Sequence, residues 1–94
     1  MGVNSFYMQV KFAKHFRKKM NKLPKPIQDK FWERMALFLK NARDPLLHDH
    51  ALSGEYIGCR SINVTGSYRA MYRHEGQRAV RFLAIGTHPE LYGK

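Results

Sequence analysis

The feature that most constrains the fold of this chain is the stretch Arg60–Arg73, in which polar and apolar residues alternate before Gly66 and, apart from Met71, also after it. Successive side chains of a β-strand point to opposite faces, so a period of two predicts two strands. Glycine supplies the backbone freedom that a tight turn between them needs. One face would hold Ile62 and Val64 against a core. The other would carry hydroxyl, amide and guanidinium groups, which suit a phosphate backbone: Ser61, Asn63, Arg69 and Arg73.

The charge of the chain favours a polyanionic partner. Seventeen Lys and Arg against seven Asp and Glu give a formal net charge of +10 on 94 residues. Nucleic acid, an acidic membrane surface or an acidic protein would attract such a chain. A hydrophobic content of 44% can form a core and disfavours disorder. We predict a single domain over residues 1–94.

Sequence signals for export or membrane insertion are lacking. No apolar run reaches the length of a membrane span or resembles a signal peptide. Cys59 is the only cysteine, so no intrachain disulfide can form. We therefore expect a cytoplasmic protein with no membrane partner.

The first half of the chain predicts a strand and two helices. Residues 6–10 alternate as a short strand, with Phe6, Met8 and Val10 on one face. Residues 11–23 then show helical spacing of apolar residues, with lysines and arginines on the outer surface. The segment Pro24–Pro26 ends this helix and opens the next, which runs to about Ala42. Its apolar stripe is Ile27, Phe31, Met35, Phe38 and Leu39.

The second half predicts strands only. Residues 46–56 are expected to form a loop, the 60–73 hairpin follows, and residues 79–85 form a last strand that is apolar on both faces apart from Arg81. The order is therefore strand, helix, helix, strand, strand, strand. We predict an α+β fold in which a helical hairpin covers one face of a three-stranded antiparallel meander. The polar, arginine-bearing face would be open.

Groups suited to RNA cleavage lie late in the chain. Such a reaction needs a base for the 2′-OH, a cation for the phosphorane and an acid for the leaving 5′-oxygen. Histidine suits the proton transfers, and arginine binds two phosphate oxygens at once. Each residue also has a structural explanation: His88 could cap the chain end, Tyr92 could pack on the sheet, and the arginines could be solvated. We expect no metal at His48 and His50, because neighbouring residues seldom converge on one ion.

Four segments and one tyrosine, in this order and spacing, resemble one family. They are Asp49–Gly54, Tyr56, Arg60–Val64, Tyr68–Arg73 and Gly86–Tyr92. The chain resembles the RelE/ParE superfamily of bacterial toxins, especially the RelE/YafQ-type mRNA interferases of type II toxin–antitoxin systems. The resemblance implies a β-α-α-β-β-β fold and an endoribonuclease that cuts mRNA in the ribosomal A site without a cofactor. It also implies a cognate antitoxin, whose acidic segment would wrap and inactivate the toxin.

The resemblance assigns residues to this site. His50, His88 and Tyr92 fall on its loop histidine, late histidine and terminal aromatic, and Arg69 falls on its phosphate-binding arginine. Relatives carry acidic, histidine or lysine residues where this chain has Ser61 and Asn63, and often an aspartate near Ser67. Serine and asparagine cannot shuttle protons at neutral pH. We therefore predict that His50 and His88 perform the proton transfers. Residues expected to hold phosphate or RNA are Arg60, Ser61, Asn63, Ser67, Arg73, Lys11, Lys14 and Lys18.

Other functions stay open at this point. ParE-type relatives inhibit DNA gyrase with the same fold, and the histidine–tyrosine terminus favours the nuclease over this alternative. A catalytically weak module that binds the ribosome is a further alternative, motivated by Ser61 and Asn63. The lysines of residues 11–22 form either a solvated helix face or a surface for rRNA or an acidic partner. The toxin alone is expected to be a monomer.

Overall fold

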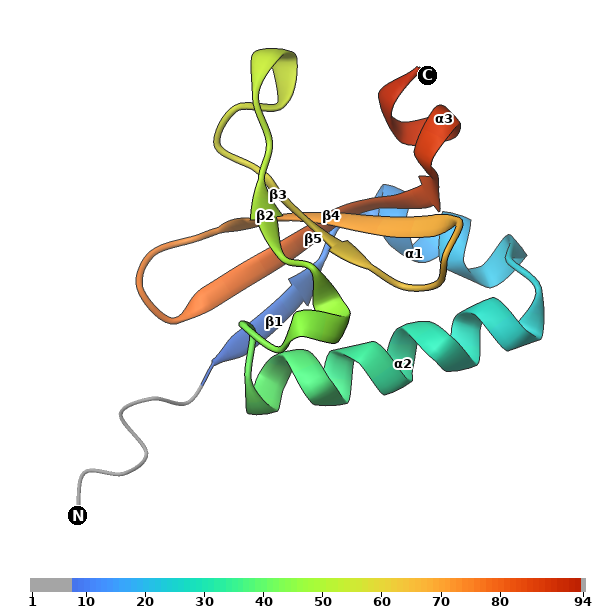
Figure 1. Cartoon of the computed structure of the whole chain (residues 1–94), viewed down its shortest axis with the longest axis horizontal. Helices are drawn as coiled ribbons and strands as arrows, with labels where there is room; N and C mark the ends of the chain where they lie inside the picture. Colours follow the sequence, from blue (N-terminus) through green and yellow to red (C-terminus); the bar gives the residue numbers. More distant parts are fainter. Residues whose placement is uncertain (1–7, 94) are drawn as a thin grey trace.

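The computed structural model describes residues 8–93, which form a five-stranded mixed sheet in the order β1-β5-β4-β3-β2 (Figure 1). The strands are β1 (Gln9–Phe12), β2 (His50–Ala51), β3 (Arg60–Asn63), β4 (Tyr68–His74) and β5 (Ala79–Thr87). Strand β1 runs parallel to β5, while β2 to β5 form an antiparallel meander. The α+β class, the element order and the helical hairpin are as predicted, but the meander has one strand more.

Two helices cover one face of the sheet, and a third rises from the other face. Helices α1 (Lys14–Lys22) and α2 (Lys25–Lys40) form the hairpin, and α2 lies beneath the sheet in Figure 1. Helix α3 (His88–Tyr92) follows β5 directly and stands on the opposite side. Within residues 8–93, no helix combines the length and the apolar composition that a bilayer crossing demands.

The core lies between the helical hairpin and the sheet. Phe16, Phe31 and Phe82 contact one another there, with ring centroids 5.3 to 5.9 Å apart. The predicted apolar face of the hairpin is confirmed, because Ile62 and Val64 are fully buried in this core. The same holds for the second arm, where Ala70 and Tyr72 face the core. Pairing of Ile62 with Ala70 joins the two arms in register.

The boundary between the first strand and the first helix was predicted too early in the chain. Lys11 and Phe12 belong to β1, since this strand pairs with β5 as far as Phe82, and α1 begins only at Lys14. Phe6, which was assigned to the first strand, lies outside the described residues. Leu39 was placed in the core stripe of α2 but is 53% exposed. Near the end of the helix Leu37 packs against the core instead.

The segment predicted as a loop is partly regular. It contains the 3₁₀-helices η2 (Pro45–Leu47) and η3 (Gly54–Tyr56), with β2 between them. Strand β2 consists of two exposed residues that pair with β3, so no buried side chain marks it in the sequence. The prediction of an open second face was wrong as well, because the 50–58 segment and α3 both rise from it.

Candidate active site

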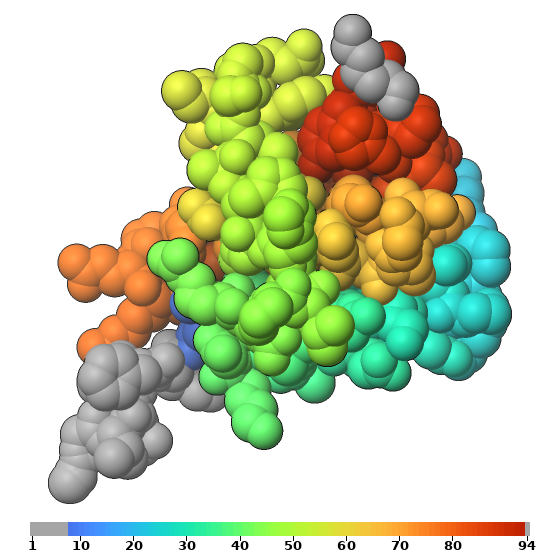
Figure 2. Space-filling view, viewed as in Figure 1, coloured from blue at the N-terminus to red at the C-terminus, as the bar shows by residue number. Residues whose placement is uncertain are grey.

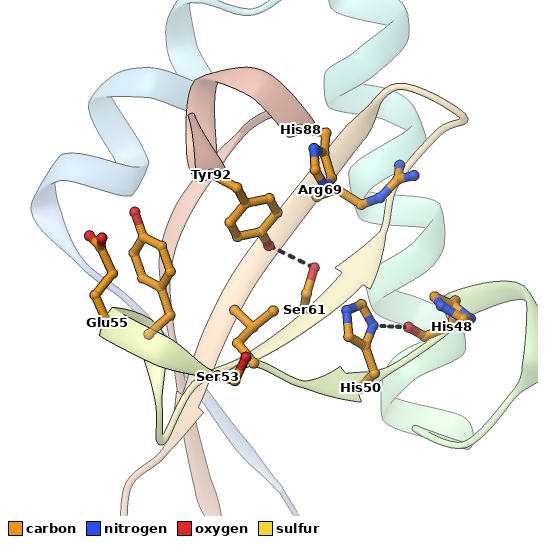
Figure 3. Close-up of a pocket in the computed structure, with 10 residues that line it drawn as sticks. His48, His50, Ser53, Glu55, Ser61, Arg69, His88 and Tyr92 are labelled. Carbon is orange, nitrogen blue, oxygen red and sulfur yellow. Dashed lines mark hydrogen bonds between the residues drawn. The ribbon is translucent and has the colours of Figure 1, made fainter. Parts of the chain in front are cut away.

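A cleft of about 550 Å³ opens between α3 and the segment that contains β2 and η3. In Figure 2 these two parts of the chain, coloured red and yellow-green, stand beside each other, with the gold region that contains the start of β4 below the red part. Figure 3 shows the side chains that converge on the cleft. They come from five elements and the loops beside them: His48, His50, Leu52, Ser53, Glu55, Tyr56, Ser61, Arg69, His88 and Tyr92.

Two tyrosines fasten α3 to the sheet and to η3. The Tyr92 hydroxyl lies 3.0 Å from Ser61 Oγ, and the Tyr56 hydroxyl donates to the carbonyl of Leu91 at 2.9 Å. Their rings meet edge to face, with centroids 5.8 Å apart. Ser61 is 1% exposed at the bottom of the cleft, so the prediction of an open serine on a bare sheet face was wrong. Desolvation, and then the Glu55 carboxylate, raise the pKa of Tyr56 and keep its phenol protonated.

A capping box starts α3. The Thr87 side chain accepts a hydrogen bond from the backbone N–H of Glu90. In return, the Glu90 carboxylate accepts a hydrogen bond from the backbone N–H of Thr87 at 2.7 Å. The Thr87 N–H, with help from Lys19, lowers the pKa of Glu90. Gly86 permits this arrangement, since a Cβ at that position would lie 2.8 Å from a Glu90 carboxylate oxygen. The backbone N–H of His88 is 3.3 Å from the Ser67 carbonyl, which ties α3 to the β3–β4 turn.

The Arg69 guanidinium is held by the turn that precedes β4. Its Nη1 donates to the carbonyls of Thr65, Gly66 and Tyr68 at 2.8 to 3.2 Å. Within the described part of the chain, Nε and Nη2 have no hydrogen-bond partner. One edge of the fork is therefore fixed by backbone, and the other edge is available to a ligand in the cleft.

The backbone of the preceding loop orients His50. Its Nδ1 lies 2.9 Å from the carbonyl of His48. A carbonyl only accepts hydrogen bonds, so Nδ1 must carry the proton, and Nε2 of the neutral ring has a free lone pair. His48 adopts a left-handed backbone with φ of 46°, which is uncommon for a non-glycine residue. The two histidine rings lie 4.9 Å apart.

Asp49 anchors this segment on the other side of the sheet. Its side chain is 5% exposed and accepts hydrogen bonds from Arg60 Nε at 2.7 Å and from the Tyr72 hydroxyl at 2.5 Å. These contacts raise the pKa of Arg60, chiefly through the hydrogen bond to Asp49. Arg60 is therefore engaged beneath β2 and does not line the cleft, contrary to its expected place beside the phosphate.

The remaining candidates lie outside the cleft lining. Asn63 pairs with Arg69 across β3 and β4, and its Oδ1 is buried without a partner among residues 8–93. Ser67 is exposed in the turn, where its N–H donates to Thr65 Oγ1 and its carbonyl accepts from the His88 N–H. Arg73 and Lys11 lie farther along the sheet and contact Glu75, while Lys14 and Lys18 are exposed on α1. The fold therefore brings together His50, Ser61, Arg69, His88 and Tyr92.

Sequence reasoning missed the part of the cleft that the 52–56 segment forms. Tyr56 was noted in the family pattern but was given no role, although it supports α3. Leu52, Ser53 and Glu55 were not proposed at all. The glycine-containing segment between His50 and Cys59 carries no periodicity, so only its return to the sheet, through the Leu52 N–H on the Cys59 carbonyl, reveals them.

This fold is shared with toxins of the RelE/ParE type. The family model described as "Bacterial toxin of type II toxin-antitoxin system, YafQ" matches residues 5–93. The chain therefore belongs to the YafQ family, which consists of ribosome-dependent mRNA interferases.

Solved structures share the fold. YafQ from E. coli superposes with a TM-score of 0.76 at 22% identity, covering 92% of this chain and 99% of that one. In the E. coli DinJ–YafQ toxin–antitoxin complex, the matching chain superposes with a TM-score of 0.73 at 23% identity, and the match covers 92% of this chain and 98% of that one. The YoeB/ParE toxin from Agrobacterium tumefaciens gives 0.73 at 15% identity, covering 86% and 99%. None of the curated proteins matches the chain.

Proposed function

We propose that this toxin cleaves mRNA on the ribosome by metal-independent attack of a 2′-OH on the adjacent phosphate. The supporting observation is the convergence of His50, Arg69, His88 and Tyr92 on one cleft above the buried Ser61. In this reaction the 2′-oxygen bonds to phosphorus and the bond from phosphorus to the 5′-oxygen breaks. The products are a 2′,3′-cyclic phosphate and a 5′-hydroxyl, with no net consumption of protons.

His50 is the proposed general base. The His48 carbonyl holds the proton on Nδ1, which leaves Nε2 as the acceptor for the 2′-OH proton. Removal of a general base or acid of this kind reduces the rate by about 10²- to 10⁴-fold.

Arg69 is the proposed cation at the scissile phosphate. Three backbone carbonyls engage Nη1, so the guanidinium does not have to be ordered during the reaction. Its remaining edge provides Nε and Nη2, a geometry that fits two phosphate oxygens. Lysine at this position would keep the charge and lose the fork.

His88 is the proposed acid for the leaving 5′-oxygen, and Tyr92 orients it. Their rings lie 4.9 Å apart in an edge-to-face contact, and the Tyr92 hydroxyl is fixed on Ser61. Ser61 therefore takes a structural part in the site, and no proton transfer is assigned to it. The chemistry rests on two histidines, one from each side of the cleft.

Cleavage of a defined mRNA on programmed ribosomes tests this assignment. We expect His50→Ala and His88→Ala to lose at least 100-fold in rate and Arg69→Lys to lose about as much, whereas Lys40→Gln, at the exposed end of α2, retains full activity. The 5′ fragments should end in a 2′,3′-cyclic phosphate. Full cleavage by both histidine variants would refute the assignment, and gyrase inhibition without mRNA cleavage would favour a ParE-type function.

We also propose an acidic antitoxin as the partner of this chain. The complex of YafQ with DinJ in E. coli supports this, as does the charge of +10, which an acidic segment would neutralise. Helix α1 contributes to that charge and contains no acidic residue. Co-purification of the chain with the product of an adjacent small reading frame, lost at high salt after Lys→Gln changes on α1, would test it.

A further inference from the structure

A second cationic feature lies on the same face of the sheet as the cleft, at the far end of the strands. Lys11 on β1 is the register partner of Arg81 on β5, and Arg81 is the partner of Arg73 on β4. Partners on neighbouring strands point to the same face, so three cations stand in one row across three strands. Their side chains are 32 to 52% exposed.

A single acidic residue serves this row. Glu75, in the β4–β5 turn, contacts Arg81 at 2.6 Å, Arg73 at 3.3 Å and Lys11 at 3.8 Å. The cations, Arg81 first, lower the pKa of Glu75. Like charges directly opposite each other destabilise a sheet, and one carboxylate offsets only one of three. The row therefore keeps an excess of two positive charges, which a phosphate chain could neutralise.

The row is aligned with the phosphate-binding side of the cleft. Arg69 and Arg73 lie four residues apart on β4, and the core side chains Ala70 and Tyr72 alternate with them, so both arginines point away from the core. The extra residue of the irregularity at Met71 and Tyr72 falls on β5 and leaves this alternation on β4 intact. Four residues of strand span about 13 Å. One extended RNA strand can reach from Arg69 to the row.

We propose that the row Lys11–Arg81–Arg73, framed by Glu75, is a second phosphate-binding site for the single-stranded mRNA whose scissile phosphate lies at Arg69. This rests on the proposed function, and it names the flank of the substrate as the ligand. The row would make the affinity depend on the length of the RNA and would fix the position of the RNA relative to the cleft, where cleavage takes place. Glu75 spaces the cations and competes with the phosphate.

Binding of a non-cleavable 2′-O-methyl oligoribonucleotide, measured by fluorescence anisotropy at several salt concentrations, tests the site. Each phosphate contact contributes about 0.7 to the slope of log K against log salt for a single strand. Lys11→Gln/Arg73→Gln should therefore reduce the slope by about 1.4. The ratio of the wild-type binding constant to that of the double variant should therefore fall about sevenfold when the salt concentration rises from 50 to 200 mM. The control Lys40→Gln/Arg43→Gln removes the same charge from the end of α2 and should keep the slope within about 0.3 of wild type.

Glu75→Gln separates this proposal from a purely structural ion cluster. It should tighten oligoribonucleotide binding severalfold at low salt, while a structural cluster would show only a lower melting temperature. A trinucleotide that fills the cleft alone should bind Lys11→Gln/Arg73→Gln and wild type equally. An unchanged slope in the double variant would overturn the proposal. A loss of affinity by the double variant only for ribosomes without mRNA would overturn it too, because it would indicate that the row binds rRNA. Because the oligoribonucleotide is not cleaved, a failure of the histidine assignment leaves these results unaffected.

Discussion

Replacement of Asp49 by alanine should destabilise the domain and also impair catalysis by His50. The Asp49 carboxylate is buried and accepts two hydrogen bonds, from Arg60 and from the Tyr72 hydroxyl. Hydrogen bonds to a charged group contribute about 1.5 to 3 kcal/mol each. The Arg60 side chain is 27% exposed, so water can solvate it after the substitution. The loss of the hydrogen bond from Arg60 therefore costs an energy near the lower end of this range. We expect a total loss of about 3 kcal/mol.

Urea unfolding followed by far-UV circular dichroism measures this loss. For a domain of this size, about 3 kcal/mol corresponds to a drop of roughly 12 to 24 °C in melting temperature. Asp49→Asn preserves the shape and should cost less than alanine. Tyr72→Phe removes one of the two bonds, and a double-mutant cycle with Asp49→Ala isolates that bond. A loss below about 1 kcal/mol in Asp49→Ala would refute the view of Asp49 as a buried anchor.

The effect on catalysis follows from the place of Asp49 beside His50. With Asp49 unanchored, β2 loses its attachment on the core side, and Nε2 of His50 is no longer held toward the cleft. We expect the cleavage rate per folded molecule to fall at least tenfold at saturating ribosomes, with ribosome binding retained. If Asp49→Ala lost stability but kept the full rate per folded molecule, the anchor would have no part in positioning His50.

Three further changes test other parts of the site. Burial and the bond to Asp49 raise the pKa of Tyr72 above its ordinary value of 10.0, so wild-type stability should fall as pH rises past about 10, and Tyr72→Phe should reduce that fall in urea titrations. Gly86→Ala would displace the Glu90 carboxylate, so it should lower the cleavage rate and loosen α3, detected as faster amide exchange at the Glu90 N–H. Tyr92→Phe loses the hydrogen bond to buried Ser61 and should cost about 1 kcal/mol in unfolding free energy, while an unchanged value would show that the bond is not formed in solution.

The arrangement of the core was predictable from the sequence because its side chains repeat with the period of the backbone. Ile62, Val64, Ala70 and Tyr72 occupy every second position of their strand arms, and each is buried in the structure. The two helices were predictable for the same reason, since the buried residues Phe31, Met35 and Phe38 recur at helical spacing. Burial of one face imposes these periods, so the sequence carries them.

The shape of the cleft was not predictable, because its walls are formed by elements without such a period. Strand β2 pairs through backbone groups alone and exposes both side chains. Helix α3 has five residues, and its start depends on the reciprocal contact between Thr87 and Glu90. Ser61 lies beneath both walls, and its contact with α3 joins it to Tyr92, which is 31 positions away in the sequence. His50, Arg69 and His88, which line the cleft, were proposed as site residues from their chemistry and from the family pattern, and their roles stay a prediction.

The parallel pairing of β1 with β5 has a consequence for the synthesis of this toxin. Gln9–Phe12 find their partners only at Ala79–Phe82, so the sheet cannot close until about seventy intervening residues have left the ribosome. The residues that complete the cleft, on α3, emerge later still. A nascent chain that stops before Thr87 lacks His88 and the rest of α3, so its cleft is incomplete. The complete cleft can therefore form only after nearly all of these 94 residues have been made.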